Sequence, residues 1–519
     1  MSIMKNKISC GNGHSDECMS DERKGDVKMR QTIPMLILMI LWTVTGAMAQ
    51  PQHGGEKPRP LHEGGHGPGG PVGPAPFGPG GPAPFGPGGP GGAHQTVTGS
   101  AVEVFSGSKG SCALPSLQVQ ATTINESAVH VKNGAICSVA QVAIQKTGDT
   151  TSEESSNFNG LNAAIGVWKG SKMTIDGGSI QTNGDGANAI FAWGPDAQVE
   201  VSKVLIRTAA NSSRGLDATY GGTIKGRNLT IETKGAHCAT LATDRGGGHV
   251  HVENVRGTTA GEGSPGIYST GDIRAVNSRF EAFGSEAAVI EGKNTIHVTN
   301  CELIGHRLCG AMLYQSFSGD AEVGTSLFDM NGGLLDAQKG PVFFVTNTKA
   351  VVKMKNATLR SADGILAKAA VARWGRTGKN GGHLVLSAEE QQLNGTVEVD
   401  DISSITLILE QKTVFNGATN TAGGAGKVNL TLNDGSRWNV TGTSYIDQIA
   451  CPEANLNTLV QRIQSNGHTI YYRKTQGALD GRTFKLPDGG KLVYAEAPQA
   501  KIPATVEQMH HQPPRPPRP

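Results

Sequence analysis

A short strand-forming motif that recurs about every 25 residues constrains the fold of this chain more than any other feature. Its form is apolar-x-apolar-x-Asn/Gly, and its final positions are separated by 26, 25, 26, 23, 23, 32 and 24 residues. The motif occurs as MTIDG (173–177), VEVSK (199–203), IKGRN (224–228), VHVEN (250–254), IRAVN (273–277), IHVTN (296–300), FDMNG (328–332) and VKMKN (352–356). Alternation places the two apolar side chains of each motif on one face of a strand. A strand repeat of this length predicts a solenoid.

A second apolar strand lies about midway along each repeat. Examples are AIFAW from Ala189, GIYST from Gly266 and AVIEG from Ala288. Two or three short strands per coil, joined by Gly-rich corners, predict an all-β parallel β-helix over residues 96–495. Dividing residues 98–493 by the repeat length gives roughly sixteen coils. We expect residues 98–130 and 450–493 to cap the strand edges at the two ends.

Asparagine ends many of the motifs. Asparagine takes the left-handed backbone conformation more readily than most residues, so we expect it to turn the chain there. Successive coils are about 4.8 Å apart, so stacked asparagines are predicted to form a hydrogen-bonded ladder. The ladder positions are Asn228, Asn254, Asn277, Asn300 and Asn356. Trp168 and Trp193 end successive second strands and are predicted to stack on each other.

Composition and charge exclude several function classes. The chain has 72 glycines, 5% aromatic and 17% charged residues, which favours a stack of small coils over an average globular enzyme. Its formal net charge of +2 produces no field that would gather nucleic acid or anionic lipid. The sequence contains no Gly-x-Ser-x-Gly elbow, His-Glu-x-x-His pair, phosphate loop or run of closely spaced aspartates. We therefore predict no cofactor, no metal site and no nucleic-acid partner.

Two cysteines are spaced by one repeat. Cys112 and Cys137 lie 25 residues apart, so in an oxidising compartment they can form a disulfide between adjacent coils. The alternative is that both are buried thiols that pack as small apolar groups.

The two ends of the chain differ from the repeats. Residues 34–46, PMLILMILWTVTG, are preceded by Lys28 and Arg30 and followed by Ala47-Met48-Ala49. This pattern predicts a signal peptide over residues 29–49, cut before Gln50, which would leave no transmembrane span. Residues 1–28 are interpreted as a misassigned start or an extension of no structural weight. Residues 50–95, rich in Gly, Pro and His, are predicted to be a linker, and residues 496–519 a disordered Pro-rich tail.

Several segments of the chain resemble known secreted proteins. LTLNDGSRWNVTGTSYI (430–446) resembles the last coils of autotransporter adhesin passengers of the pertactin type. GAHCATLATDRGGG (235–248), GEGSPGIYSTGDI (261–273) and RWGRTGKNGG (373–382) are similar to a family of bacterial secreted β-helix proteins described as adhesin-like. The resemblance implies a right-handed parallel β-helix, export and a surface-binding role, and it carries over no catalytic residues.

Ligand-binding candidates lie in the Gly-rich segment after residue 372 and on the second strands. Trp374 is flanked by Arg373 and Arg376. An exposed tryptophan beside arginine can stack on a sugar ring or bind a carboxylated glycan, whereas the alternative is a tryptophan that closes a coil edge. The binding candidates are Arg245, Tyr268, Tyr314, Arg373 and Trp374.

Acidic residues in or just after the second strands provide the candidates for an enzyme site. They are Asp217, Asp244, Asp272 and Glu291. Stacked coils could bring such carboxylates to about 5–10 Å from each other, the separation that glycoside hydrolysis needs. Asp244 and Glu291 are the catalytic candidates under this hypothesis. The alternative is that Asp244 with Arg245, and Glu291 with Lys293, are local ion pairs at solvated corners.

The sequence thus favours an exported, adhesin-like binding protein, secreted or at the cell surface, that contacts glycans or another cell surface. A polysaccharide lyase or glycoside hydrolase on the same scaffold is the alternative, because the fold by itself does not choose between them.

Overall fold

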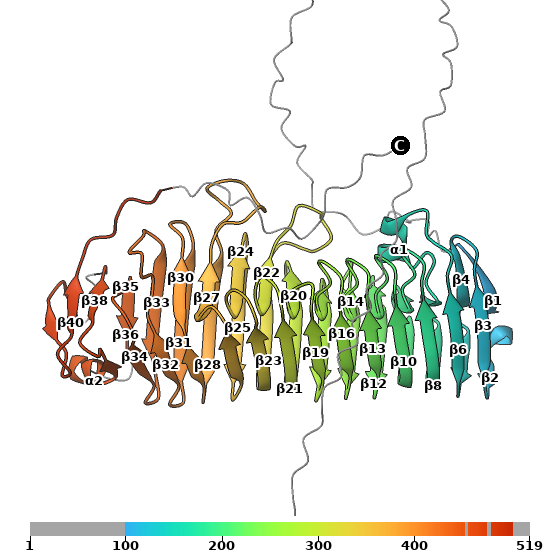
Figure 1. Ribbon diagram of the computed structural model, residues 1–519, viewed down its shortest axis with the longest axis horizontal. Helices are drawn as coiled ribbons and strands as arrows, with labels where there is room; N and C mark the ends of the chain where they lie inside the picture. The colour runs from blue at the N-terminus through green and yellow to red at the C-terminus, as the bar shows by residue number, and fades with distance from the viewer. Residues whose placement is uncertain (1–98, 452–454, 475–478, 502–519) are drawn as a thin grey trace, which may run out of the picture. The chain divides into compact units, whose positions relative to one another are not determined.

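The computed structural model describes residues 99–451, 455–474 and 479–501. It is a parallel β-helix of about 16 turns, as the repeat predicts. Figure 1 shows its coils stacked along one axis, from blue at β1 to red at β40. The predicted signal peptide, the linker and the tail from residue 502 onward lie outside the described residues.

One parallel sheet runs along the solenoid and is built from the second strand of each coil. We call it sheet A. Its strands, in order of pairing, are β1 (Ser100–Ser106), β4 (Glu126–Lys132), β7 (Ile165–Trp168), β9 (Ile190–Trp193), β11 (Leu216–Thr219), β14 (Leu241–Thr243), β17 (Ile267–Ser269), β20 (Ala288–Glu291), β22 (Ala311–Tyr314), β24 (Phe343–Thr346), β27 (Ile365–Ala369) and β30 (Thr396–Val399).

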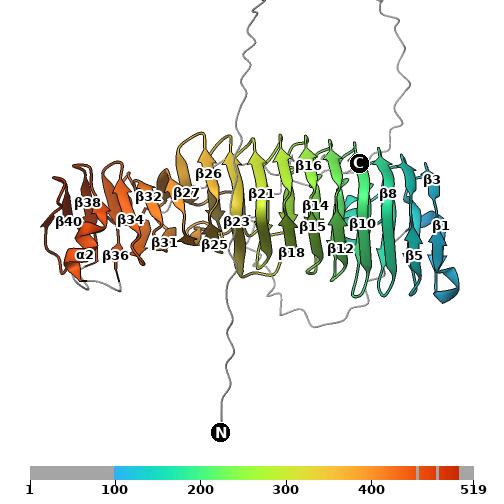
Figure 2. The same cartoon turned by 90° about the horizontal axis from the view of Figure 1, so that it is seen from below.

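A second parallel sheet, sheet B, contains the first strand of each coil and the strand that follows the bend after it. Its strands, in chain order, are β2 (Cys112–Leu114), β3 (Leu117–Ala121), β5 (Ile136–Val139), β6 (Val142–Lys146), β8 (Lys172–Thr182), β10 (Gln198–Thr208), β12 (Thr223–Arg227), β13 (Thr230–Thr233), β15 (His249–Glu253), β16 (Arg256–Thr259), β18 (Asp272–Val276), β19 (Arg279–Ala282), β21 (Thr295–Gly305), β23 (Thr325–Ala337), β25 (Lys349–Lys355), β26 (Thr358–Ser361), β28 (His383–Glu389), β31 (Ser404–Glu410), β33 (Lys427–Leu432) and β36 (Gln448–Ala450). Figure 2 shows the first strands side by side from β8 to β25.

The C-terminal coils add two small sheets and a helix. The first sheet contains β29 (Gln392–Asn394), β32 (Val414–Gly417), β34 (Arg437–Val440) and β37 (Ile463–Gln464). The second contains β35 (Ser444–Ile446), β38 (Thr469–Tyr472), β40 (Lys491–Tyr494) and β39 (Phe484–Lys485). The β39–β40 pair is antiparallel, and α2 (Leu456–Gln461) lies at the same end (Figure 1). These elements end the parallel stack where capping was expected.

The core is a set of apolar columns that run along the solenoid axis. Alternation buries every second residue of the first strands, and these residues pair in register from coil to coil. One column contains Ile224, Val250, Ile273, Ile296 and Phe328, all fully buried. Each coil therefore buries only its own slice of apolar surface against two neighbours, which is how a solenoid builds a continuous core.

The asparagine prediction is confirmed in its backbone geometry. Asn228, Asn254, Asn277, Asn300 and Asn356 all have positive φ values, between 49° and 55°. They lie at the bend between the two sheet B strands of a coil. One link of the predicted hydrogen-bonded ladder is present, from Asn300 Nδ2 to Asn277 Oδ1 at 3.5 Å, whereas Asn356 Nδ2 donates to Glu390 of the next coil at 3.3 Å. The first four asparagines line an open groove of about 600 Å³.

The two tryptophans are in register as predicted, because Trp168 pairs with Trp193 between β7 and β9. Their rings, however, pack on other partners. The Trp168 ring meets His130 edge-on at 4.4 Å, and the Trp193 ring lies 5.6 Å from Tyr220. Each indole therefore packs on a side chain that the repeat pattern does not predict as its partner.

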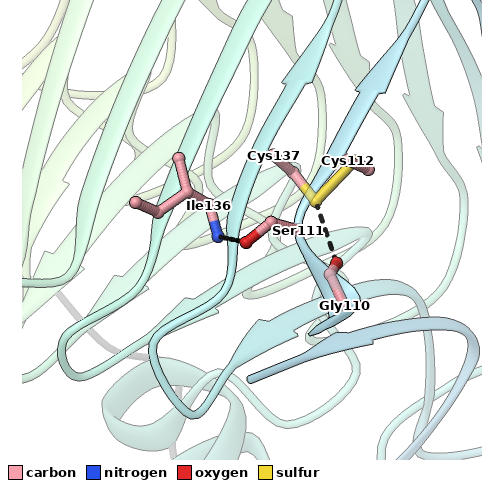
Figure 3. Close-up of a disulfide and its surroundings, with 5 residues drawn as sticks. All are labelled: Gly110, Ser111, Cys112, Ile136 and Cys137. Atoms are coloured by element: carbon pink, nitrogen blue, oxygen red, sulfur yellow. Dashed lines mark hydrogen bonds between the residues drawn. A yellow bond between two sulfur atoms is a disulfide. The ribbon is translucent and has the colours of Figure 1, made fainter. Parts of the chain in front are cut away.

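A disulfide joins the first two full coils (Figure 3). Cys112 and Cys137 are register partners on β2 and β5, with their Cα atoms 4.4 Å apart. Of the two alternatives from the sequence, the inter-coil bridge is therefore the one present. The other four cysteines of the described residues, Cys238, Cys301, Cys309 and Cys451, are buried and not in disulfides.

At the corner before sheet A, glycines of successive coils approach each other too closely for a side chain. A Cβ added to Gly261 would overlap the carbonyl oxygen of Gly235, and one added to Gly284 would overlap that of Gly261. Only glycine fits at these positions, because the backbones of adjacent coils touch there.

We expect Gly261→Ala to destabilise the fold by about 1–3 kcal/mol, the usual cost of overpacking a tight site. Gly442→Ala is the matched control, since a Cβ at Gly442 would meet only the Cβ of Ala418 at 3.6 Å, an ordinary contact. Urea denaturation followed by circular dichroism measures both variants. Equal denaturation midpoints for the two variants would contradict the prediction.

Two coils carry long loops, and the strands that flank the loops still pair with neighbouring coils; β27 has one register shift against β30, between Ile365 and Ala367. Residues 315–324 follow β22, and residues 370–382 follow β27. Tyr314 still pairs with Thr346 between β22 and β24, and Lys349 still pairs with His383 between β25 and β28. Figure 1 shows these loops along the same long edge as α1 (Glu153–Asn159). The added residues therefore leave the solenoid on one side only.

Candidate functional site

The outer side of sheet A carries polar residues, although outward-facing side chains of a solenoid are usually solvated. Core residues such as Leu216 and Ala218 alternate with Asp217 and Thr219, so the latter point away from the core. Both outward residues are nevertheless fully buried. They are covered because α1 and the loop 315–324 lie over this side of the sheet.

Helix α1 is held onto sheet A by contacts from three coils. Ser152 caps its N-terminus by accepting a hydrogen bond from the backbone N–H of Ser155. The carbonyl of Phe158 accepts a hydrogen bond from Thr219 at 3.0 Å, and the Arg245 guanidinium lies 3.7 Å from the centroid of the Phe158 ring. Asn188, just before β9, donates to the carbonyl of Ser156 at 3.1 Å, so the helix closes the outer side of β9, β11 and β14.

Beneath this cover lies a buried cluster of one arginine and two aspartates, Arg214, Asp217 and Asp244. Arg214 forms an ion pair with Asp244 and lies 3.9 Å from Asp217. Its other amino group donates to Asn157 in α1 at 2.6 Å. Burial raises the pKa of Asp217 well above its usual value, and the Asp244 carboxylate raises it further. Burial thus favours the neutral form of Asp217, and the charge of Arg214 is balanced by its ion pair with Asp244.

A second buried cluster surrounds Glu291. Tyr268 and Tyr314 both donate to Glu291 Oε2, at 2.8 and 2.9 Å. Ser316 and Ser318 of the loop donate to Oε1, the latter at 3.2 Å. Burial and the Glu291 carboxylate raise the pKa of both tyrosines, so they remain hydrogen-bond donors. This cluster ties the loop 315–324 to three coils of sheet A.

An aromatic group with an arginine lies where the two loops meet, and we call it the aromatic–arginine patch: Tyr314, Phe317, Arg373 and Trp374. The Trp374 ring lies 5.7 Å from the Tyr314 ring and 6.3 Å from the Phe317 ring. The Arg373 guanidinium is stacked 4.0 Å from the Trp374 centroid. Phe317 is 66% exposed, and Arg376 is also exposed. The patch therefore presents the exposed Phe317 ring to solvent beside a stacked cation.

All five residues predicted to bind ligand lie in or next to these clusters. Tyr268 and Tyr314 meet at Glu291, and Arg373 and Trp374 belong to the patch. Arg245 forms an ion pair with Asp320 in the loop 315–324. The structure thus brings together residues from β14 to β27, and their role in binding stays a prediction.

The interpretation of the acidic residues as local ion pairs at solvated corners is wrong. Asp244 is only 4% exposed and pairs with Arg214 instead of Arg245. Glu291 is only 1% exposed and accepts from tyrosines, while Lys293 pairs with Glu322. The catalytic candidates Asp244 and Glu291 are consequently covered by protein. Asp272 is not near them, because it begins β18 in sheet B.

Sequence reasoning missed Arg214 and the loop residues Ser316, Phe317, Ser318 and Asp320. Arg214 lies two residues before its strand, and its partner Asp244 is 30 residues away. Arg245 and Asp320 are 75 residues apart. The only sequence signal for the loop was the one long spacing of 32 residues between motifs.

The comparison with known proteins agrees with the fold. No family model matches the chain, and no solved structure matches it significantly. The BrkA autotransporter of Bordetella pertussis (strain Tohama I) is 29% identical over 155 residues. The chain is a parallel β-helix protein similar to autotransporter passengers. The match covers 27% of this chain and 15% of its relative, so the chain corresponds to a small part of the relative's length. No helix in residues 99–451, 455–474 or 479–501 is long and apolar enough to span a membrane.

Proposed function

We propose that this β-helix is an exported, adhesin-like protein, secreted or displayed at the cell surface, and that it contacts a carboxylated glycan through the aromatic–arginine patch. Export is supported by the similarity to the BrkA autotransporter. It is also supported by the Cys112–Cys137 disulfide, a bond that persists in oxidising compartments.

The observation that carries the proposed contact is the exposed ring of Phe317 beside the Arg373–Trp374 stack. Aromatic rings provide flat apolar surfaces for sugar rings, and an arginine fork matches a carboxylate. Arg376 and Lys379 are exposed on the same loop, which adds positive charge to the patch. A carboxylated glycan satisfies both features, whereas a neutral glycan uses only the rings.

The alternative of a polysaccharide-cleaving enzyme rests on Asp217, Asp244 and Glu291. Their burial places them out of reach of a polymer, and Asp244 and Glu291 are already paired with Arg214 and two tyrosines. These contacts favour a role in holding α1 and the loop 315–324 on the solenoid.

Binding of the purified chain to an array of neutral and carboxylated glycans tests the proposal. We expect saturable binding to carboxylated members and about tenfold weaker binding for Trp374→Ala and for Arg373→Ala, the usual effect of losing a central contact. The matched control is Phe283→Ser. Phe283 is 49% exposed and stacks on His306 at 4.7 Å, away from the patch.

A reducing-sugar and unsaturated-product assay on the same glycans separates the two functions. No product is expected. Product that disappears in Asp244→Asn or Glu291→Gln would establish the enzyme instead, and equal binding by Trp374→Ala and the wild type would place the contact elsewhere.

A further inference from the structure

Two histidines and an aspartate meet on the outer surface of sheet B, away from the clusters on sheet A. β15 has the burial alternation of a surface strand, with Val250 and Val252 in the core and His249 and His251 outside. The next coil places Asp272, the first residue of β18, directly opposite His249. The two histidines of β15 and Asp272 of the neighbouring strand β18 therefore lie on the same surface of sheet B.

The three side chains direct their ligand atoms to a common point. His251 Nε2 lies 3.2 Å from Asp272 Oδ2, and His249 Nδ1 lies 3.9 Å from the same oxygen. One nitrogen or oxygen atom of each residue lies within 4.8 Å of the others. Thr295, in register on the following coil, donates to Asp272 Oδ1 at 2.7 Å and so orients the carboxylate.

This donor set suits a borderline divalent transition metal. Two imidazole nitrogens and one carboxylate oxygen are common zinc ligands, and bond lengths of about 2.0–2.2 Å place tetrahedral ligand atoms about 3.3 Å apart. Both histidines are partly exposed, so small side-chain rotations bring the atoms to that separation. The fourth position faces solvent and would hold water. The hydrogen bond from Thr295 is the kind of outer contact that fixes a ligating carboxylate.

Arg274 competes for the same carboxylate. Its Nε donates to Asp272 Oδ2 at 2.9 Å, and its side chain is 56% exposed. A bound cation would displace this guanidinium into solvent, at a modest cost because exposed ion pairs contribute little stability. Lys225, the register partner of His251 on β12, is a second positive charge nearby.

We propose that His249, His251 and Asp272 form a surface site for a divalent transition metal of the zinc class, and that Arg274 forms an ion pair with the Asp272 carboxylate when no metal is bound. The sequence gives no metal motif because the ligands are contributed by two coils. Calcium, which prefers a shell of six or more oxygens, is not expected to bind there.

Zinc and cobalt titrations of the full chain test the site. Scattered histidines such as His53, His62 and His66 contribute background binding, so variants are compared in the same chain. His251→Ala is expected to remove one bound Zn²⁺ per chain and the visible absorption of tetrahedral Co²⁺. His297→Ala is the matched control, because His297 also faces an aspartate, Asp329, at 3.3 Å but belongs to no three-ligand cluster among the described residues.

Arg274→Ala provides a test in the opposite direction. Removing the competing guanidinium is expected to tighten Zn²⁺ binding about threefold, a gain that misfolding cannot produce. Circular dichroism confirms that His251→Ala is folded. The proposal fails if His251→Ala and His297→Ala bind as much zinc as the wild type, or if Arg274→Ala does not tighten binding.

Discussion

Replacing Arg214 with methionine is expected to lower the free energy of unfolding by about 3–5 kcal/mol, the cost of leaving a buried carboxylate without its partner. Arg214 is only 7% exposed and forms an ion pair with the buried Asp244. Its loss also removes the hydrogen bond to Asn157 that holds α1. Asp217→Asn is expected to change stability by no more than about 1 kcal/mol, because burial raises the pKa of Asp217 and so favours its neutral form, which asparagine replaces with a neutral side chain of similar size.

The control for Arg214 is Arg207→Met. Arg207 also pairs with an acid one coil away, Glu232 at 2.8 Å, but its side chain is 49% exposed. An exposed ion pair contributes little to stability, because water and salt screen it. Urea denaturation followed by circular dichroism compares the variants, and limited proteolysis near Asn159 reports on release of α1. Similar losses for Arg214→Met and Arg207→Met would show that burial does not set the energy of the cluster.

Acid is expected to destabilise the N-terminal coils by about 3 kcal/mol between pH 6.5 and about 4. Burial, with a smaller contribution from the charge of Lys132, lowers the pKa of His130 from 6.5 to about 4. The unfolded chain therefore binds a proton below pH 6.5 while the folded chain stays neutral at His130. The stabilisation that depends on neutral His130 is fully present above pH 6.5. It is lost as the pH falls from 6.5 through the folded-state pKa of about 4.

His130→Phe isolates this effect, because phenylalanine keeps a ring against Trp168 and cannot titrate. The difference in unfolding free energy between the wild type and His130→Phe should shift by about 3 kcal/mol in favour of the variant from pH 7 to pH 4. Comparing the two proteins cancels the other titrating groups, such as Asp217, whose raised pKa acts in the opposite direction. His297→Phe, at a partly exposed histidine, controls for the substitution itself. A difference that does not vary with pH would contradict the prediction.

The repeating part of the fold could be predicted from sequence because it depends on local rules. Alternation predicts that Val250 and Val252 are buried, and asparagine at position 254 predicts the left-handed bend that is observed. The spacing of Cys112 and Cys137 by one repeat placed them in adjacent coils. Each of these predictions needs only the period and the chemistry of one or two residues.

The covering layer could not be predicted because it depends on contacts between distant coils. Nothing local distinguishes Asp244 from a solvated corner aspartate, since its partner Arg214 and the helix above it come from other repeats. Glu291 likewise became buried because the loop 315–324 folds back over it. Whether an outward residue is solvated is decided by the path of an insertion, which periodicity does not describe.

The continued strand pairing around the two long loops makes this scaffold suitable for loop exchange. Tyr314 pairs with Thr346 just before the first loop, and Lys349 pairs with His383 just after the second, so loops of two different lengths fit the same stack of coils. A foreign binding loop could therefore replace residues 317–323, provided that it keeps the anchors of the present loop: Ser316 and Ser318 on Glu291, and Asp320 on Arg245. A rod of this kind separates the part that determines length and rigidity from the part that determines specificity, and each can vary without the other.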